Sequence, residues 1–153
     1  MCFELREVPD WTTGISCTPT ALAAISGRSL SAIGLLLRQA ASERGAEIAR
    51  ELRQDYNIND WLRSVELMGG SWTESQTFDG DFDRRPSIER WMRDSATADL
   101  VLVFADNGDG IAHVFATELR MVVDTYTEGR RVPFGDVPSE FKQFRVKRVF
   151  RIT

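Results

Sequence analysis

The chain has 153 residues, of which 42% are hydrophobic and 27% are charged, a composition typical of a globular domain. A chain of this length buries about 70% of the surface that it exposes when unfolded, which is enough for one hydrophobic core. We therefore predict a single domain over residues 1–153. The formal net charge of -4 argues against a general nucleic-acid-binding protein, because such proteins contact phosphates with a basic surface.

The sequence shows no sign of a membrane or export segment. No stretch reaches the roughly 18 consecutive apolar residues that a membrane span requires. The amino terminus, MCFELREVPD, lacks the basic and apolar regions of a signal peptide. We therefore expect a cytoplasmic protein without a membrane partner.

The counts of cysteine and histidine limit the metal chemistry. Cys2, Cys17 and the single histidine, His113, form neither a C-x-x-C nor an H-x-x-x-H pair, so we expect no zinc site. Residues 106–110 (DNGDG) share letters with a calcium loop but lack its twelve-residue spacing and closing glutamate, and we predict a hairpin turn there. We expect no metal, no cofactor and two free thiols.

The first third of the chain is predicted to be mainly helical. Residues 2–8 are expected to form an edge strand or an extended arm, followed by an irregular loop at 9–14. The run TPTALAAISG at 18–27 predicts a helix, and a second helix is predicted at 29–44. The apolar residues that recur at helical spacing in the second segment are Leu30, Ile33, Leu37 and Ala41.

The middle of the chain alternates helices with loops. Residues 46–56 are expected to form a charged helical stretch or a loop, and a third helix is predicted from the cap at Asn57 to Gly69 and Gly70. A strand is expected at 71–78. An exposed acidic loop at 79–83 and a short helix at 86–93 complete this part.

The last third of the chain is rich in predicted strands. They are expected at residues 100–105, 111–117, 121–127 and 144–152. Helices that precede a run of strands indicate an α+β protein, in which N-terminal helices pack on a C-terminal antiparallel β-sheet.

Cys17 and His113 are the predicted nucleophile and base. Cys17 lies at the start of the first predicted helix, where N–H groups and the positive end of the helix dipole stabilise a thiolate. A thiolate nucleophile is usually paired with an imidazole that accepts and returns the proton, and His113 is the only imidazole in the chain.

Asp124 is the predicted third member of this group. If residues 111–117 and 120–127 form a hairpin with an even number of loop residues, such as Glu118 and Leu119, then His113 and Asp124 share a face of the sheet. Asp124 would then accept the second ring N–H of His113 and stabilise the imidazolium. A three-residue loop would place Asp124 on the opposite face.

The order of these segments resembles that of small bacterial and phage-type members of the papain-like cysteine-peptidase superfamily. The resemblance rests on CTPTALAAISGRS at 17–29, IAHVFATELRMVVDTY at 111–126 and RVKRVFRI at 145–152, and it extends over nearly the whole chain. It implies a papain-like fold, a peptide or protein substrate and no cofactor. It also implies a triad of Cys17 as nucleophile, His113 as base and Asp124 as its orienting carboxylate, which form and resolve a thioester.

The chain departs from the larger members of that superfamily before the nucleophile. Those members have a glutamine there that completes the oxyanion hole, whereas residues 9–16 contain none. We expect the Cys17 backbone N–H, with a hydroxyl of Thr12 or Thr13, to take that role, and Trp11 to lie beside the substrate. Loss of one oxyanion donor commonly costs about 10²- to 10³-fold in rate.

Three alternatives remain open at the level of the sequence. The chain can be a catalytically silent papain-like domain that serves as a protein-binding or assembly module, for instance in a phage particle or against a host protein. Removal of Met1 would make Cys2 an amino-terminal nucleophile whose own amine acts as the base. Finally, Cys17 and His113 can both be ordinary buried residues of the core.

Overall fold

The computed structural model describes residues 2–46, 52, 56–95 and 98–153, and it confirms the predicted α+β class. Six strands form one antiparallel sheet in the order β1-β6-β2-β3-β4-β5. The strands are β1 (Trp72–Thr77), β2 (Val101–Asp106), β3 (Ala112–Glu118), β4 (Met121–Val123), β5 (Val132–Pro133) and β6 (Arg145–Ile152). The charged segment predicted at 46–56 lies largely outside the described residues.

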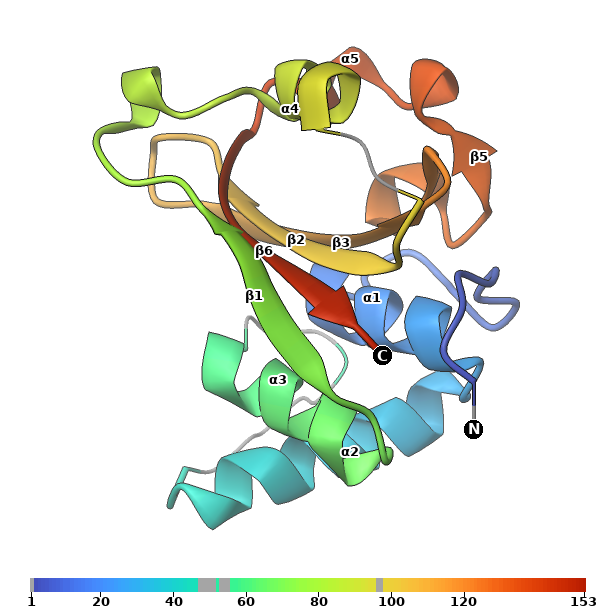
Figure 1. The fold of residues 1–153 in the computed structure, drawn as a ribbon. Coiled ribbons are helices and arrows are strands. Elements are labelled where there is room, and N and C mark those ends of the chain that lie inside the picture. The colour runs from blue at the N-terminus through green and yellow to red at the C-terminus, as the bar shows by residue number, and fades with distance from the viewer. Residues whose placement is uncertain (1, 47–51, 53–55, 96–97) are drawn as a thin grey trace.

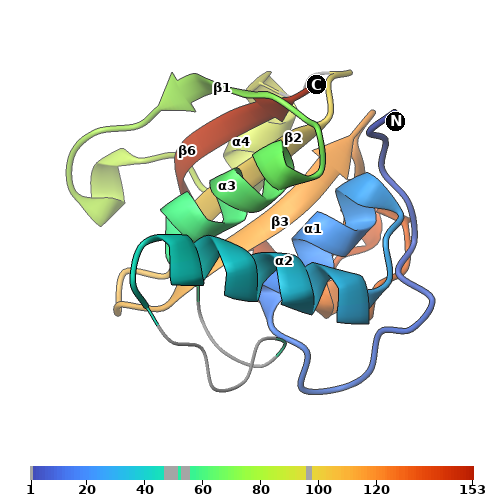
Figure 2. The ribbon, with the colours of Figure 1, turned by 90° about the horizontal axis from the view of Figure 1, so that it is seen from below.

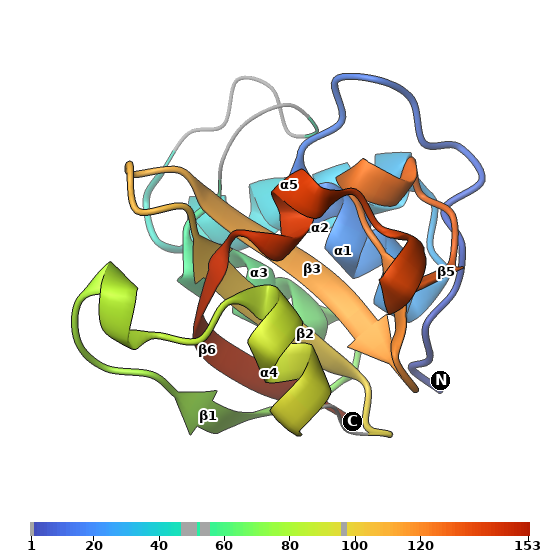
Figure 3. The same ribbon diagram turned by 90° about the horizontal axis from the view of Figure 1, so that it is seen from above.

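Helices cover both faces of this sheet (Figure 1). On one face lie α1 (Cys17–Ser26), α2 (Leu30–Glu43) and α3 (Ile58–Leu67), which are in front in Figure 2. On the other face lie α4 (Ile88–Ser95) and the short α5 (Ser139–Lys142), which are in front in Figure 3. The sequence predicted α2, α3 and α4 to within a few residues, but it gave no indication of α5 or β5.

The central strand β2 shows why two layers of helices are needed. Leu102 belongs to the apolar cluster under α1, α2 and α3, whereas its neighbour Val103 belongs to the cluster under α4 and α5. Both side chains are fully buried. A strand that is buried on both faces appears as a continuous apolar run rather than an alternating one, and this explains the run at 100–105.

Among the described residues, none of the helices has the length and apolar character to cross a membrane alone. The helices α1 and α2 meet that criterion only as a pair, and a bend of 113° separates them.

The amino-terminal arm is extended but forms no strand. The backbone N–H of Glu4 donates to the carbonyl of Ile25 at 3.2 Å, and that of Arg6 donates to Ala24 at 2.8 Å. These carbonyls belong to the last turn of α1, where a helix leaves its own acceptors unsatisfied. The arm therefore closes the carboxyl end of α1, the end opposite to Cys17.

The hairpin of β3 and β4 has an even loop, as predicted, but a different register. Glu118 pairs with Met121, so the loop is Leu119 and Arg120, one residue later than expected. Both loop residues have positive φ, 54° and 62°, as a two-residue hairpin turn of the right twist requires. The prediction of a strand over 121–127 was wrong in its second half, because β4 ends at Val123 and a 3₁₀ turn follows.

The last strand carries one irregularity. Phe104 of β2 pairs with Arg148 and Ala105 pairs with Val146, which leaves Lys147 as an extra residue in β6. Such a bulge breaks the alternation of side chains along a strand. It accounts for the adjacent exposed Lys147 and partly exposed Arg148 in the basic run at 145–151.

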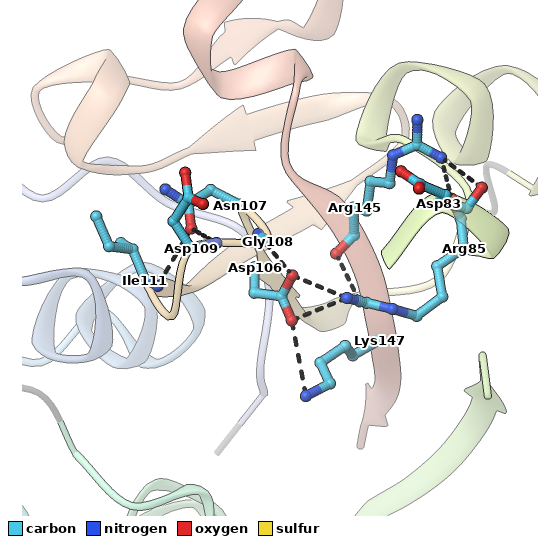
Figure 4. Close-up of polar contacts among 9 residues, drawn as sticks. All are labelled: Asp83, Arg85, Asp106, Asn107, Gly108, Asp109, Ile111, Arg145 and Lys147. Atoms are coloured by element: carbon cyan, nitrogen blue, oxygen red, sulfur yellow. Dashed lines mark hydrogen bonds and ion pairs between the residues drawn. The ribbon is translucent and has the colours of Figure 1, made fainter. Parts of the chain in front are cut away.

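A buried ion pair anchors the loop between β2 and β3 (Figure 4). Arg85, which is only 4% exposed, donates from one terminal nitrogen to both carboxylate oxygens of Asp106, at 2.8 and 2.9 Å. Asp106 also accepts from the backbone N–H of Gly108, and the amide oxygen of Asn107 accepts from the N–H groups of Asp109 and Ile111. The loop is thus held at its base and within itself.

Removal of this carboxylate is expected to destabilise the protein. The substitution Asp106→Ala leaves a buried guanidinium without its counter-charge and should lower the free energy of unfolding by about 3 kcal/mol or more. The matched change Glu74→Ala breaks the more exposed Glu74–Arg148 pair, with nitrogen–oxygen distances of 2.8 Å. It should cost about 1 kcal/mol or less. Urea unfolding measures both, and equal losses would contradict this ranking.

Candidate active site

Cys17 is the first residue of α1 and follows the N-cap residue Ser16. The first N–H groups of a helix have no acceptor within the helix, so they and the helix dipole favour an anion at this position. The Cys17 side chain is half-buried, whereas Cys2 is exposed, and both thiols are free. The position of Cys17 therefore agrees with the prediction of a thiol at a helix amino terminus.

His113 lies on β3 at a point where the neighbouring strand has ended. The strand β4 pairs only with residues 116–118 of β3, so this edge is not covered by a strand at His113. The imidazole is nevertheless buried, with 6% of the residue exposed. Asp124 occupies the open edge: His113 Nε2 lies 2.9 Å from its Oδ1 and 2.8 Å from its Oδ2.

Asp124 is held in place by the 3₁₀ turn that it begins (η2, Thr125–Thr127). Its backbone N–H donates to the hydroxyl of Thr127 at 2.9 Å, and its side chain accepts from the N–H of Tyr126 at 3.3 Å. This reciprocal capping fixes the carboxylate before any substrate arrives. The predicted pair of His113 and Asp124 is present, although a turn rather than a continuous strand positions the aspartate.

Cys17 lies beside His113, since both side chains line one pocket. Because Nε2 is engaged by Asp124, the ring nitrogen left for the sulfur is Nδ1. Burial by itself lowers the pKa of His113. The charge and hydrogen bond of Asp124, followed by those of Cys17, outweigh burial and raise that pKa above its ordinary value. The raised pKa favours the charged form of His113, an imidazolium beside the Asp124 carboxylate.

Aromatic rings surround the buried imidazole. The ring centroids of Phe144, Tyr126 and Phe141 lie 5.3, 5.5 and 5.9 Å from that of His113. Electron-rich ring faces favour a neighbouring cation. Their packing also restricts the imidazole to one orientation, so the site is rigid on this side.

A pocket of about 270 Å³ opens at the thiol, and its lining includes Cys17, His113 and Tyr56. Most of its other walls are apolar, namely Trp61, Phe104, Gly110, Ala112 and Val114. Burial, and then the charge of Asp60, raise the pKa of the Tyr56 phenol, so this hydroxyl keeps its proton. The pocket thus places a thiol and an imidazole beside an apolar surface.

The residues predicted to flank the nucleophile do not line this pocket. Trp11, Thr12 and Thr13 are absent from its described lining. The indole N–H of Trp11 donates instead to the hydroxyl of Thr20 at 3.2 Å, on the second turn of α1. The expected placement of Trp11 beside the substrate and the hydroxyl donors at Thr12 and Thr13 gain no support from this geometry.

Several residues of the site escaped the sequence-based prediction. Tyr56 lies beside a stretch without periodicity, and Phe141 falls in a segment for which no element was predicted. Phe144 opens the strand predicted at 144–152, but nothing in the sequence placed it at the site. Thr127 had a usable signal, because an aspartate followed three residues later by a threonine is a capping pattern.

No group of three or more metal-binding side chains occurs in the described part of the chain. No protein-family model matches the chain, and no curated protein sequence matches it.

The raised pKa of His113 predicts a pH-dependent contribution to stability. A group whose pKa is higher in the folded state stabilises the fold fully below its unfolded pKa and loses that effect as the pH rises through the folded value. The range here runs from about 6.5 to about 10. The stability difference between the wild type and His113→Asn should therefore be largest near pH 6 and shrink steadily toward pH 10.

Urea unfolding at several pH values measures this difference. No other histidine is present to titrate, and the tyrosines and cysteines are common to both proteins. A difference that stays constant over this range would show that Asp124 does not stabilise a charged His113.

Proposed function

We propose that the chain is a thiol hydrolase of the papain-like kind that cleaves a peptide or amide bond. The observation that carries the proposal is the position of one buried imidazole between the Asp124 carboxylate, 2.8 Å away, and the thiol that begins α1. A nucleophile, a base and an orienting carboxylate in series are the parts that thiol acyl transfer requires. The resemblance of the sequence to papain-like peptidases points to the same chemistry.

The reaction would proceed through a thioester. The Cys17 thiolate attacks the carbonyl carbon, and the imidazolium of His113 donates its proton to the departing amine as the carbon–nitrogen bond breaks. A water molecule then attacks the thioester and gives one proton to His113. The carbon–sulfur bond breaks, which releases the acid and restores the Cys17 thiolate beside the imidazolium. Asp124 stays ionised throughout and keeps Nε2 in the correct orientation.

The oxyanion that forms in both steps lies next to the start of α1. The backbone N–H of Cys17 and the positive end of the helix dipole are suited to stabilise it. The Tyr56 phenol is a second hydrogen-bond donor that lines the same pocket.

A catalytically silent binding module is the second candidate. It is favoured by the lack of a glutamine in residues 9–16 and by the positions of Thr12 and Thr13 outside the pocket of Cys17. If the Tyr56 phenol does not serve as the second oxyanion donor, a preserved triad would turn over slowly. In that case the protein would bind a protein partner through the same face.

Alkylation tests the triad within one molecule, since the exposed Cys2 is an internal control. At about pH 6, iodoacetamide should modify Cys17 at least about tenfold faster than Cys2, because only Cys17 has an imidazolium that stabilises its thiolate. Mass mapping of the two peptides measures each rate. His113→Asn should remove the advantage of Cys17 and leave the rate of Cys2 unchanged.

Equal and slow modification of both thiols between about pH 6 and pH 8 would speak against a nucleophilic Cys17. It would favour the binding module.

Acyl transfer itself is tested with p-nitrophenyl acetate. The wild type should release a burst of one p-nitrophenol per protein, while Cys17→Ala should release none. Asp124→Asn removes the charge that orients and stabilises the imidazolium, so acylation should fall about 10²-fold or more. A burst that persists in Cys17→Ala would assign the chemistry to another nucleophile, such as Cys2.

A further inference from the structure

A second and larger cavity adjoins the candidate site on the opposite side of His113. It is a groove of about 780 Å³ on the face of the sheet that carries α4 and α5. Tyr126 and Phe144 line this groove and also pack against the ring of His113, with centroids 5.5 and 5.3 Å away. These two rings therefore lie between the groove and the buried imidazole.

The loop between β2 and β3 borders both cavities. Gly110 lines the pocket of Cys17, while Asp109 and Ile111, on either side of it, line the groove. The buried pair of Arg85 and Asp106 anchors this loop at its base (Figure 4). One rigid segment thus separates the thiol pocket from the groove, and an extended chain lying in the groove would pass next to the thiol.

The acidic side chains of the groove have no basic partner. Glu89, Asp109 and Glu140 come from three separate segments and line the groove. All three are exposed, and no ion pair links them to any lysine or arginine of the described residues. None of the three carboxylates is therefore neutralised by a direct ion pair among the described residues, and they outnumber the two cations that line the groove, Lys142 and Arg145.

The two cations of the groove are engaged elsewhere. Arg145 donates to the carbonyls of Asp83 and Arg85 at 3.1 and 2.8 Å, and its guanidinium stacks on the ring of Phe82. Lys142 lies over the ring of Phe134 at 5.3 Å. These contacts restrain both cations. The carboxylates are therefore more available to a bound peptide than the positive charges are.

The groove also exposes apolar surface next to these carboxylates. Ile111 is 58% exposed and Tyr126 is 37% exposed. An aliphatic stem with a terminal cation, the side chain of lysine or arginine, matches an apolar surface flanked by carboxylates.

We infer that this groove binds the substrate segment next to the scissile bond and selects peptides with lysine or arginine side chains. The role of the segment as a substrate rests on the proposed function. The volume of the groove and its position next to the rings of Tyr126 and Phe144, which pack on His113, define the site. The three carboxylates determine only the preferred charge.

Peptide binding to a variant that lacks the Cys17 thiol tests the inference. In the full chain with Cys17→Ala, fluorescence polarisation compares two labelled peptides, one of alternating glycine and lysine and one of alternating glycine and glutamate. The lysine peptide should bind at least about tenfold more tightly at low salt, and added salt should weaken it, because exposed charges are screened. Replacement of Glu89, Asp109 and Glu140 by glutamine or asparagine should abolish the preference.

A matched control changes the same number of charges on other parts of the surface. Glu4→Gln, Glu43→Gln and Glu66→Gln alter the amino-terminal arm, α2 and α3, away from the face that carries α4 and α5. This variant should retain the preference for the lysine peptide. Equal losses in both triple variants would show a general effect of net charge and overturn the groove as a specific site.

The groove inference and the hydrolase proposal can fail independently, and the two measurements distinguish these failures. If the lysine peptide binds no better than the glutamate peptide while Cys17 is still rapidly alkylated, the groove inference is wrong and the hydrolase proposal stands. If the lysine peptide binds selectively but Cys17 reacts as slowly as Cys2, the groove is a peptide-binding site on a silent domain.

Discussion

The contact between His113 and Asp124 is the interaction on which the candidate site depends. Both oxygens of the carboxylate lie within 2.9 Å of the same ring nitrogen, inside a shell of aromatic rings that excludes water. A buried imidazole would normally be neutral, but this carboxylate makes the charged form favourable. The charged ring lines the same pocket as the Cys17 side chain, so the pair sets the electrostatic surroundings of that pocket.

The sheet makes this contact possible by ending one strand early. The strand β4 stops at Val123, and the turn that follows brings Asp124 against the uncovered edge of β3. On the other face, α4 and α5 bury the second side of the sheet and bring Phe141 and Phe144 to the imidazole. The same two segments contribute to the walls of the large groove. They therefore determine both the packing of the core on this face and the shape of the groove.

Two cavities of different kinds therefore lie on either side of one loop. The pocket of Cys17 is small and mainly apolar, whereas the groove is wide, open and rich in carboxylates. The loop at 107–111 lies between them and is fixed by the buried Arg85 and Asp106 pair. A substrate that spans both would be positioned by the groove and cleaved at the pocket, which is a division of tasks that rigid loops commonly support.

Local signals in the sequence determined the helices from α1 to α4, most strands and the placement of Cys17 at a helix start, because caps, glycines and apolar periodicity act over a few residues. Parity along the hairpin also predicted that His113 and Asp124 meet, although a turn after β4, rather than a paired strand, brings the carboxylate to the imidazole. Only the tertiary structure decided that β4 ends at Val123, that α5 exists and that Trp11 turns toward Thr20. These outcomes depend on contacts between segments that are far apart in the chain. A local pattern of residues does not predict the energies of such contacts.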